Sequence, residues 1–414
     1  MMLNRLAWKN IWRHKRRTLI TGFSISFGVF LATTFTGIGD YTYTNMIDVS
    51  ATMGLGHVTV EPAGYNLAPS LDKRLQNASQ IQQQIMTLPQ VTQTNARIMG
   101  QAMFASASKS IGGSFMAIDP ATETPAANLF IKSIVEGELF ASADTRGIAI
   151  GTVMAEKLNL RLGKKIVYTT TDVDGEIVGE VARISAIFHT GLDEVDGAMA
   201  LLPINLMRKT LSYQSDDTSI ITVLISDQRD AEMVRNEVAK IVRSEDVEIL
   251  SWKKTQGDMN GFVTLKRGSQ FLMELLIGLV IAAGILNTIL MGVIERSREF
   301  AVMVAVGMAP LALFLLVMVE AFWLAIIGLI LGIIITAPWF YYLFYTGLDY
   351  SAMMEGMQDV SAGGVLFDPL IRIRLFKESI IAILSGLFLL TLFSALYPAW
   401  RAMRTDTVDN LKTI

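Results

Sequence analysis

Residues 275–294 read LLIGLVIAAGILNTILMGVI, twenty consecutive positions without a charged side chain. A helix of about 20 apolar residues crosses the ~30 Å hydrocarbon core of a bilayer. Three further apolar stretches occur, at 19–38, within 300–348 and at 379–400. The sequence therefore predicts four transmembrane helices, and a long segment of ordinary polarity separates the first of them from the other three.

The composition agrees with this division. Hydrophobic residues make up 51% of the chain and charged residues 18%, and the mean hydropathy is +0.43. Typical soluble domains carry about 25% charged residues. The net charge of −3 gives no indication of a nucleic-acid partner. The chain has no cysteine, which excludes disulfides, thiolate metal sites and a cysteine nucleophile.

Charge near the first apolar stretch predicts the orientation. Residues 1–17 hold six Lys and Arg residues and no acidic residue, and such segments stay on the cytoplasmic side. A cleavable signal peptide is the alternative, but the apolar run is longer than the 7–15 residues of a signal-peptide core. No small-x-small cleavage pattern follows it. We expect an uncleaved anchor, with both termini in the cytoplasm.

The expected fold is an α-helical membrane protein with four transmembrane helices and a large α+β extracytoplasmic domain inserted between helices 1 and 2. The expected segments are a cytoplasmic basic lead-in helix at 1–17, membrane helices at 18–40, 271–294, 310–345 and 379–400, an external α+β domain at 41–270, a cytoplasmic coupling segment at 295–309, an external loop at 346–378 and a cytoplasmic tail at 401–414. Residues 349–378 carry five acidic and three basic residues, and we expect this loop to cover the external end of the bundle.

Within the external domain, hydrophobic patterns predict both strands and helices. Residues 57–61 alternate with the period of a strand, and 77–88 have the spacing of a helix. Residues 166–170 and 177–187 flank Asp174-Gly175, a strong hairpin signal. Residues 228–242 predict a helix with Met233, Val234, Val238 and Ile241 facing inward. We expect an α+β module with a strand-rich insertion at about 110–215.

Several motifs, in order, resemble one family. They are LAWKNIWRHKRR at 6–17, IAIG at 148–151, MAEKLNL at 154–160, LGKKI at 162–166, IFHTG at 187–191, LPI at 202–204, NTILM at 287–291, ERSRE at 295–299 and YPAWRA at 397–402. This set is similar to the MacB/FtsX-type ABC transporter permeases, and most similar to the lipoprotein-releasing LolC/LolE branch. The resemblance covers nearly the whole chain.

The resemblance implies a bacterial inner-membrane permease that works with other proteins. The implied partners are a cytoplasmic ABC ATPase dimer, a second permease subunit that is identical or homologous, a lipoprotein or other amphiphilic substrate, a periplasmic carrier and membrane lipids. The chain lacks the Gly-x-x-x-x-Gly-Lys-Ser/Thr loop that cradles nucleotide phosphates. We therefore expect no cofactor in this chain, and ATP and Mg²⁺ in the partner ATPase.

The only cytoplasmic loop between spans carries the expected ATPase-docking residues. They are Glu295, Arg296, Ser297, Arg298 and Glu299. The alternative is a solvated loop whose charges form helical ion pairs worth about 0.2–0.5 kcal/mol each. The resemblance favours docking.

Other polar and aromatic residues lie inside the predicted spans. Glu320 sits in the third span, where a carboxylate is costly, and it serves either a relay or gating role or a polar contact between helices. Phe23, Phe27 and Phe30 share one face of the first span. They line a substrate cavity on the family resemblance, or else make ordinary packing or lipid contacts. Gly328 and Gly332 form a GxxxG pattern, which serves packing within one subunit or between two.

No catalytic site is expected. His14, His57 and His189 are far apart in sequence, so none has a metal-ligand partner at suitable spacing. The acidic run at 193–196 lacks calcium-loop spacing and is expected to be a solvated hairpin tip. No nucleophile–base pattern supports a membrane-anchored enzyme. The leading hypothesis is a permease driven by mechanotransmission. The alternative is a non-transporting signal transmitter of the FtsX type that activates an envelope hydrolase.

Overall fold

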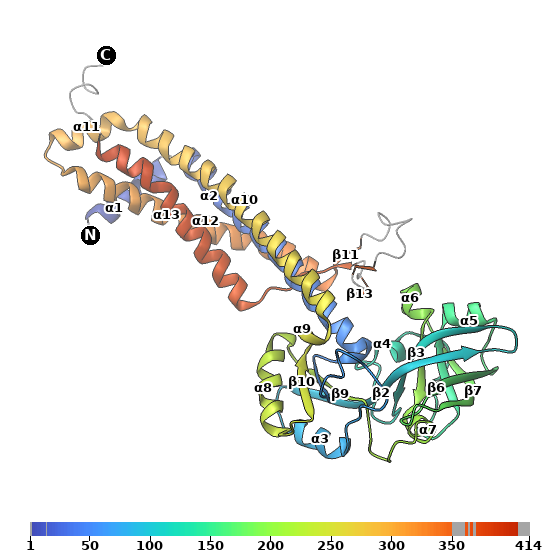
Figure 1. Ribbon diagram of the computed structural model, residues 1–414. Coiled ribbons are helices and arrows are strands. Elements are labelled where there is room, and N and C mark those ends of the chain that lie inside the picture. Colours follow the sequence, from blue (N-terminus) through green and yellow to red (C-terminus); the bar gives the residue numbers. More distant parts are fainter. Residues whose placement is uncertain (1, 14, 350–360, 363–364, 367–369, 405–414) are drawn as a thin grey trace. The chain divides into compact units, whose positions relative to one another are not determined.

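The computed structural model describes residues 2–13, 15–349, 361–362, 365–366 and 370–404. The chain divides into two compact units (Figure 1). Unit 1 comprises residues 1–43, 264–353 and 369–414, and unit 2 comprises residues 44–263 and 354–368.

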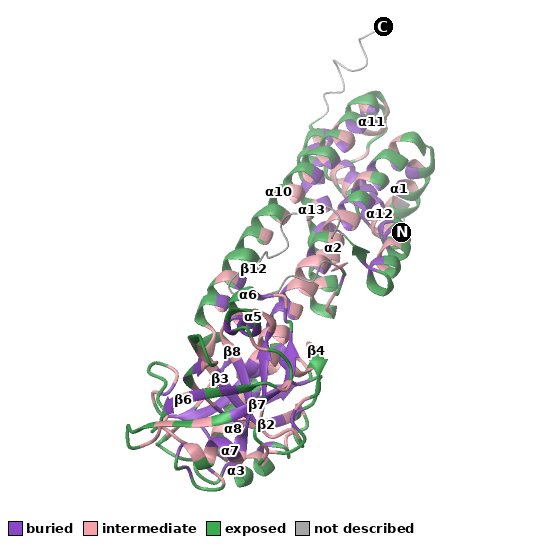
Figure 2. Cartoon of the chain, turned by 90° about the vertical axis from the view of Figure 1, so that its right-hand side faces the viewer, coloured by how far each residue is buried: buried purple, intermediate pink, exposed green. Residues whose placement is uncertain are grey.

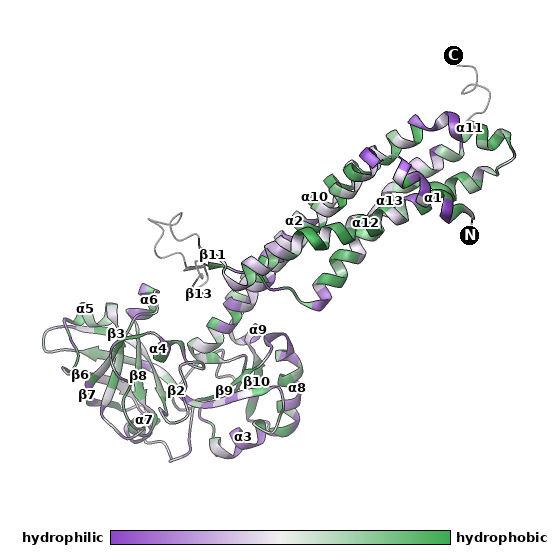
Figure 3. Ribbon diagram, turned by 180° about the vertical axis from the view of Figure 1, so that it is seen from behind, coloured by the Kyte–Doolittle hydropathy of each residue, from purple (hydrophilic) through white to green (hydrophobic). Residues whose placement is uncertain are grey.

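Long helices build unit 1. They are α1 (Met2–Arg13), α2 (Lys15–Ser50), α10 (Gly257–Glu295), α11 (Ser297–Ala305), α12 (Pro310–Tyr345) and α13 (Lys377–Met403). Four helical segments of the described chain are long and apolar enough to cross a membrane: Lys15–Leu55, Gly257–Glu295, Pro310–Tyr345 and Lys377–Met403 (Figure 3). The expected fold class is confirmed.

Two of these helices extend beyond the predicted spans. α2 continues from the span at 18–40 to Ser50, and α10 begins at Gly257, well before the span at 271–294. The additional turns are polar, for example GDMNGFVTLKRGSQ at 257–270. Hydropathy identifies only the apolar part of a helix. The helix itself can continue into water, because its backbone hydrogen bonds do not depend on apolar side chains. Both helices are continuous through the residues at which the chain divides into its two units.

The GxxxG pattern of α12 packs within the chain. A Cβ at Gly328 would lie 2.6 Å from Ile25, and one at Gly332 would lie 2.7 Å from Val29. The hydroxyl of Ser26 donates a hydrogen bond to the carbonyl of Gly328 at 3.0 Å. These glycines thus let α2 and α12 approach closely, as small residues do in membrane helix pairs.

Short strand pairs lie within the predicted external loop at 346–378. β11 (Leu348–Asp349) pairs with β14 (Leu370–Ile371), and β12 (Ser361–Ala362) pairs with β13 (Val365–Leu366). Most of residues 349–378, and the tail at 405–414, lie outside the described residues, as do the predictions made for them. His14 also lies outside them.

Unit 2 is built on a mixed sheet whose strands are largely buried (Figure 2). Its strands are β1 (Val58–Pro62), β2 (Val91–Ala105), β3 (Ser110–Ile118), β4 (Ile134–Gly137), β5 (Gly147–Gly151), β6 (Lys165–Thr171), β7 (Ile177–Phe188), β8 (Met199–Pro203), β9 (Ile220–Ile225) and β10 (Val247–Ser251). The pairing β2-β3-β8-β5-β7-β6-β2 returns to its start, so these strands close into a barrel. Its interior holds fully buried side chains, among them Phe104, Phe115, Ile150, Ile166 and Tyr168.

Strand β2 belongs to two parts of the sheet. Its first half, from Val91 to Arg97, pairs with β9, and its second half, from Ile98 to Ala105, pairs with β3. The order β10-β1-β9-β2 continues outward from the first half. β2 therefore joins a small open sheet to the barrel.

Short helices complete unit 2. They are η1 (Ala51–Leu55), α3 (Ala78–Ile85), α4 (Leu129–Lys132), α5 (Thr152–Leu158), α6 (Asp193–Asp196), α7 (Ile204–Thr210), η2 (Gln228–Asp230), α8 (Ala231–Ile241) and α9 (Trp252–Thr255). The helix predicted at 228–242 is present as η2 and α8, with Val234 and Val238 buried. The prediction that Met233 faces inward is wrong, since its side chain is exposed.

The hairpin predicted at Asp174-Gly175 is confirmed: β6 and β7 pair in antiparallel register, and Gly175 has φ +80°. The expectation of a solvated hairpin tip at 193–196 is correct for Asp193 and Glu194, which are exposed, and wrong for the hairpin and for Asp196. These residues form helix α6, and Asp196 is fully buried. Its carboxylate accepts hydrogen bonds from the backbone N–H of Thr190 at 3.0 Å and from its hydroxyl at 2.7 Å. These hydrogen bonds offset the cost of removing the charged carboxylate from water.

Candidate functional site

A buried polar cluster in unit 1 surrounds Glu320 of α12. Arg296, between α10 and α11, donates from Nη1 to both carboxylate oxygens of Glu320 at 3.0 Å. Asn10 of α1 donates from Nδ2 to Oε1 at 2.8 Å. Arg17 of α2 places Nη2 at 3.8 Å from Oε2. One carboxylate on α12 thus contacts three other parts of the helical bundle, α1, α2 and the α10–α11 junction.

Arg296 is the centre of this cluster. Arg296 is only 3% exposed. Its Nε donates to Glu299 at 3.1 Å, and its guanidinium lies 5.1 Å from the ring centroid of Phe300. Its Nη2 atom has no hydrogen-bond partner among the described residues. Arg17, Arg296 and Glu320 border a cavity of about 10 Å³. The pair is therefore buried but not fully satisfied.

The cost of breaking a buried ion pair makes this cluster a strong connection between helices. Removing one partner of a buried ion pair costs about 3–5 kcal/mol, because the other charge is left unpaired. α1, α2, α12 and the α10–α11 junction therefore resist separation at this point. Of the two roles considered for Glu320, the structure supports the contact between helices, and the relay or gating role stays a prediction.

The predicted docking residues have unequal positions. Glu295 and Arg298 are exposed, Ser297 and Glu299 are half-buried, and Arg296 is buried. Arg296 faces the bundle, so direct docking would require it to leave Glu320. Glu299 also approaches Arg13, with Nη1 3.7 Å from Oε1. Their docking role stays a prediction, with Glu295 and Arg298 the most accessible members.

Sequence analysis missed Asn10 and Arg17 as partners of Glu320. Asn10 and Glu320 are 310 positions apart, and no local spacing connects them. The one available signal was the cost of Glu320 in an apolar helix, which predicts that some cation or donor must reach it.

The aromatic stripe lies on an outer face of unit 1. Phe23 is 66% exposed and Phe27 is 51% exposed. Phe30 stacks with Phe27 at 6.4 Å and contacts Trp339 at 6.2 Å between ring centroids. The stripe is therefore not part of the bundle core of this chain. Its contact with substrate stays a prediction.

A second buried pair, also missed by sequence analysis, lies in unit 2. Arg97 of β2 and Glu123 are both buried, with Nε 2.6 Å from Oε1 and Nη2 2.9 Å from Oε2. Nη1 of Arg97 donates to the carbonyl of Gly54 at 2.7 Å. Gly54 lies in η1, directly after α2, and has φ +146°. The pair thus fixes the end of α2 to the sheet.

Two further contacts hold the same region. Nε2 of His57 lies 3.0 Å from Oδ1 of Asp48 on α2, and Ser50 hydrogen-bonds to Gln256. The last turns of α2 are therefore attached to the residue just before β1 and to the residue between α9 and α10. Among the described residues, no group of three or more His, Cys, Asp or Glu side chains is arranged to hold a metal ion.

Comparison with known proteins gives two family matches. The profile described as MacB-like periplasmic core domain matches residues 18–241, and the profile described as FtsX-like permease C-terminal matches residues 271–407. The periplasmic region of MacB from Actinobacillus actinomycetemcomitans is 11% identical, covers 50% of this chain and 94% of that chain, and has a TM-score of 0.35.

Similar curated proteins include transporter components. The lipoprotein-releasing system transmembrane protein LolC of Xylella fastidiosa (strain 9a5c) is 23% identical over 280 residues, which is 64% of this chain and 64% of that protein. The pyoverdine export ATP-binding/permease protein PvdT of Pseudomonas fluorescens is 22% identical over 342 residues, 79% of this chain and 50% of that protein. The chain thus spans less than two thirds of the length of these relatives.

The two profiles lie in the order that the sequence motifs predicted, one over the first apolar helix and the sheet-rich unit, the other over the last three apolar helices. They confirm the resemblance drawn from the motifs, and the chain belongs to the MacB/FtsX-type family of ABC transporter permeases.

Proposed function

We propose that this chain is the permease subunit of an ABC transporter that works by mechanotransmission. A separate cytoplasmic ATPase dimer hydrolyses ATP, and two permease subunits convert its closure into movement of an external domain. The substrate is an amphiphile, such as a lipoprotein, taken up at the external side of a bacterial inner membrane. Both chain termini lie in the cytoplasm in this proposal.

One observation carries the proposal: α2 and α10 are continuous helices that each belong to both units. A continuous helix transmits a displacement along its axis without losing it in a flexible loop. At one end, Arg17 of α2 and Arg296 after α10 both contact Glu320. At the other, Gly54 after α2 accepts from Arg97 of the sheet.

The partner ATPase is supported by the family, whose members include proteins named as transmembrane and as ATP-binding/permease components. The segment from Glu295 through α11 is the proposed contact, since it interrupts two long apolar helices with charged, accessible residues. The amphiphilic substrate is supported by the relative named for lipoprotein release. The exposed Phe23 and Phe27 offer it an apolar surface.

Reconstitution tests the transport function. The full chain is placed in proteoliposomes with its cognate ATPase and a fluorescently labelled lipoprotein, and ATP hydrolysis and lipoprotein release are measured together. We expect release that depends on ATP. Stimulation of an envelope hydrolase without release of any bound amphiphile would instead support the signal-transmitting function of the FtsX type.

A topology reporter tests the orientation separately. An enzyme that is active only outside the cytoplasm, fused after Gly175, should be active, whereas the same enzyme fused after Ile414 should not. The opposite pattern would exclude the proposed orientation, and with it a cytoplasmic ATPase contact at α11.

A further inference from the structure

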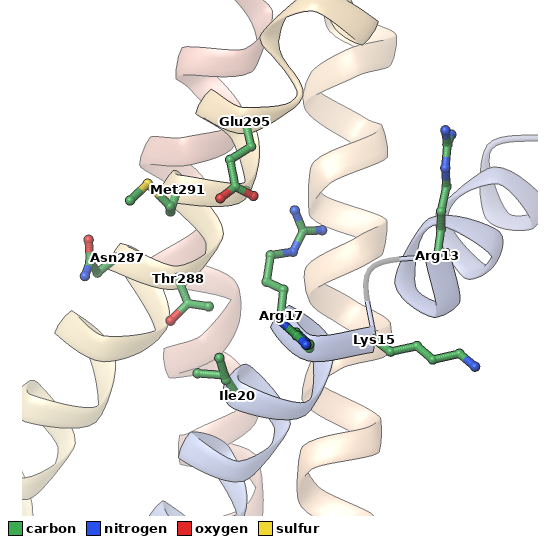
Figure 4. Close-up of a pocket in the computed structure, with 10 residues that line it drawn as sticks. Arg13, Lys15, Arg17, Ile20, Asn287, Thr288, Met291 and Glu295 are labelled. Carbon is green, nitrogen blue, oxygen red and sulfur yellow. The ribbon is translucent and has the colours of Figure 1, made fainter.

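A cavity of about 700 Å³ opens between the start of α2 and the last turns of α10 (Figure 4). Arg13, Lys15, Arg16 and Arg17 line it from the end of α1 and the start of α2, and Met291 and Glu295 line it from α10. All of these residues belong to unit 1. Figure 4 shows that Arg17 and Glu295 extend toward each other from the two helices.

The charges of this cavity are unbalanced. Four cations face one carboxylate, which leaves an excess of three positive charges. Arg17 is engaged with Glu320, and Arg13 approaches Glu299. Lys15 and Arg16 are exposed, and neither has a hydrogen bond or ion pair to another described residue. Two of the cations are thus available to an anion from outside the chain.

Two of the helices that line the cavity, α2 and α10, also pack closely against each other there. A Cβ added at Gly292 of α10 would lie 2.0 Å from Nη1 of Arg17. The arginine therefore lies directly over the glycine, and any larger residue would displace its guanidinium from the cavity. Basic residues that only set the membrane topology would not need to fit against a glycine of another helix.

The remaining lining indicates the kind of anion. Ile20 is 60% exposed and Met291 is 58% exposed, although both line the cavity. Asn287 and Thr288 add hydrogen-bonding groups on α10. A ligand that fits must carry negative charge next to the cations and an apolar part next to Ile20 and Met291. A free phosphate satisfies only the first requirement.

We propose that this cavity binds the headgroup of an anionic phospholipid, with its phosphate at Lys15 and Arg16 and the beginning of its acyl chains along Ile20 and Met291. Basic pockets between membrane helices are suited to such headgroups. In the proposed orientation, the lipid belongs to the cytoplasmic leaflet. It would lie directly beside Arg17, one of the groups that hold Glu320.

Native mass spectrometry of the full chain in detergent tests the site. The protein is titrated with phosphatidylglycerol, with phosphatidylcholine, and with soluble glycerol 3-phosphate and inorganic phosphate. The test variant is Lys15→Gln/Arg16→Gln. The matched control is Arg5→Gln/Lys9→Gln, which removes the same charge from exposed positions of α1 that do not line the cavity. The melting temperatures of both variants are compared with wild type.

We expect selective binding of phosphatidylglycerol, weakened about thirtyfold in the test variant and little changed in the control. Each Lys or Arg near an anionic surface contributes about 1 kcal/mol, and 1.4 kcal/mol is a factor of ten. Equal losses in both variants would show general surface attraction and overturn the proposal. Equal affinity for glycerol 3-phosphate or inorganic phosphate would overturn the lipid assignment.

An acidic surface of the partner ATPase is the other occupant to be tested. If the test variant binds phosphatidylglycerol like wild type but loses the ATPase in a pull-down, the cavity is a protein contact and the lipid site is excluded. Lipid binding is measured without the ATPase, so this result is independent of whether the chain transports an amphiphile.

Discussion

Two buried Arg–Glu pairs of the described residues, Arg97–Glu123 in unit 2 and Arg296–Glu320 in unit 1, differ in how completely their hydrogen bonds are formed. In unit 2, Arg97 uses Nε, Nη1 and Nη2 on Glu123 and Gly54 within 2.9 Å. In unit 1, Arg296 leaves Nη2 without a partner among the described residues, and Arg17 stays 3.8 Å from Glu320.

We call the fully hydrogen-bonded Arg97–Glu123 pair the fixed joint, in contrast to the incompletely bonded Arg296–Glu320 pair. The Arg97 pair has its hydrogen bonds to Glu123 and Gly54 fully formed, so it holds the end of α2 firmly to the sheet. The partly satisfied pair has one unpaired donor, Nη2 of Arg296, which could bond to another acceptor. In the proposed mechanism, the Glu320 cluster is the part of unit 1 that is expected to rearrange, whereas the Arg97 pair is expected to stay intact in unit 2.

The largest effect is expected at the fixed joint. Glu123→Gln should lower the free energy of unfolding of unit 2 by about 3–5 kcal/mol, because it leaves the Arg97 cation buried without a counter-charge. Thermal unfolding of the full chain in detergent measures this. The control, Lys209→Gln, breaks an exposed pair with Asp144 and should leave the melting temperature nearly unchanged, because solvent screens such pairs. A small loss at Glu123 would contradict the assignment of a fixed joint.

A somewhat smaller loss of stability, about 3 kcal/mol, is expected for Glu320→Gln, since Arg296 retains Glu299. The double variant Arg296→Met/Glu320→Met should recover part of this stability, because apolar residues of similar size can replace a buried ion pair, although Arg17 and Asn10 lose their carboxylate partner. It should nevertheless lose substrate-dependent ATP hydrolysis in proteoliposomes. Normal coupling in the stable double variant would show that the cluster only packs the bundle.

Another buried carboxylate, that of Glu61, sharpens the comparison because it forms no ion pair with a cation among the described residues. Glu61 of β1 is buried, and burial raises the pKa of its carboxyl to about 7. This pKa already includes a lowering by the backbone N–H of Asn66 and a further raising by the charge of Glu248, its partner across β1 and β10. The folded state therefore holds this proton more tightly than the unfolded state.

The sign of the pH effect follows from this pKa. Between the ordinary pKa near 4.5 and about 7, the folded state binds more protons than the unfolded state, so stability falls as pH rises through this window. The loss is on the order of 3 kcal/mol. Thermal unfolding of wild type and Glu61→Gln between pH 4.5 and 8 measures it. An identical pH dependence in both proteins would show that Glu61 does not titrate in this range.

The smallest effect is expected at an accessible residue of the coupling segment. Arg298→Glu leaves both buried pairs intact, so unfolding should change by less than about 0.5 kcal/mol. Binding of the cognate ATPase in a pull-down should weaken by about a factor of ten if Arg298 contacts an acidic group. Unchanged binding and unchanged hydrolysis would move the docking surface to the basic residues at the start of the chain.

The sequence predicts the membrane part well because lipid imposes a strong and local rule. About 20 apolar residues suffice to identify a span, and each of the four predicted spans lies within or overlaps an apolar helix. The rule says nothing about the polar turns 257–270, so the start of α10 was missed. The hairpin at Gly175 was also predictable, since its turn needs a positive φ that glycine adopts readily.

The two buried pairs could not be predicted in the same way. Arg97 and Glu123 are 26 positions apart on separate elements, and Asn10 and Glu320 are 310 apart. Their contact depends on the tertiary fold, and a single sequence carries no signal for it. The burial of Asp196 was missed for the same reason, because an acidic run in sequence is usually solvated.

Strand β2 carries Arg97 at its midpoint and continues for eight more residues into the barrel. A strand cannot slide along its neighbours by one residue, because every side chain would then point to the opposite face. β2 is also paired on both sides over part of its length, with β3 and with β6. Arg97 and the barrel residues that follow it in β2 are therefore held in one fixed register, so a displacement of Arg97 along β2 would have to carry the barrel strands with it.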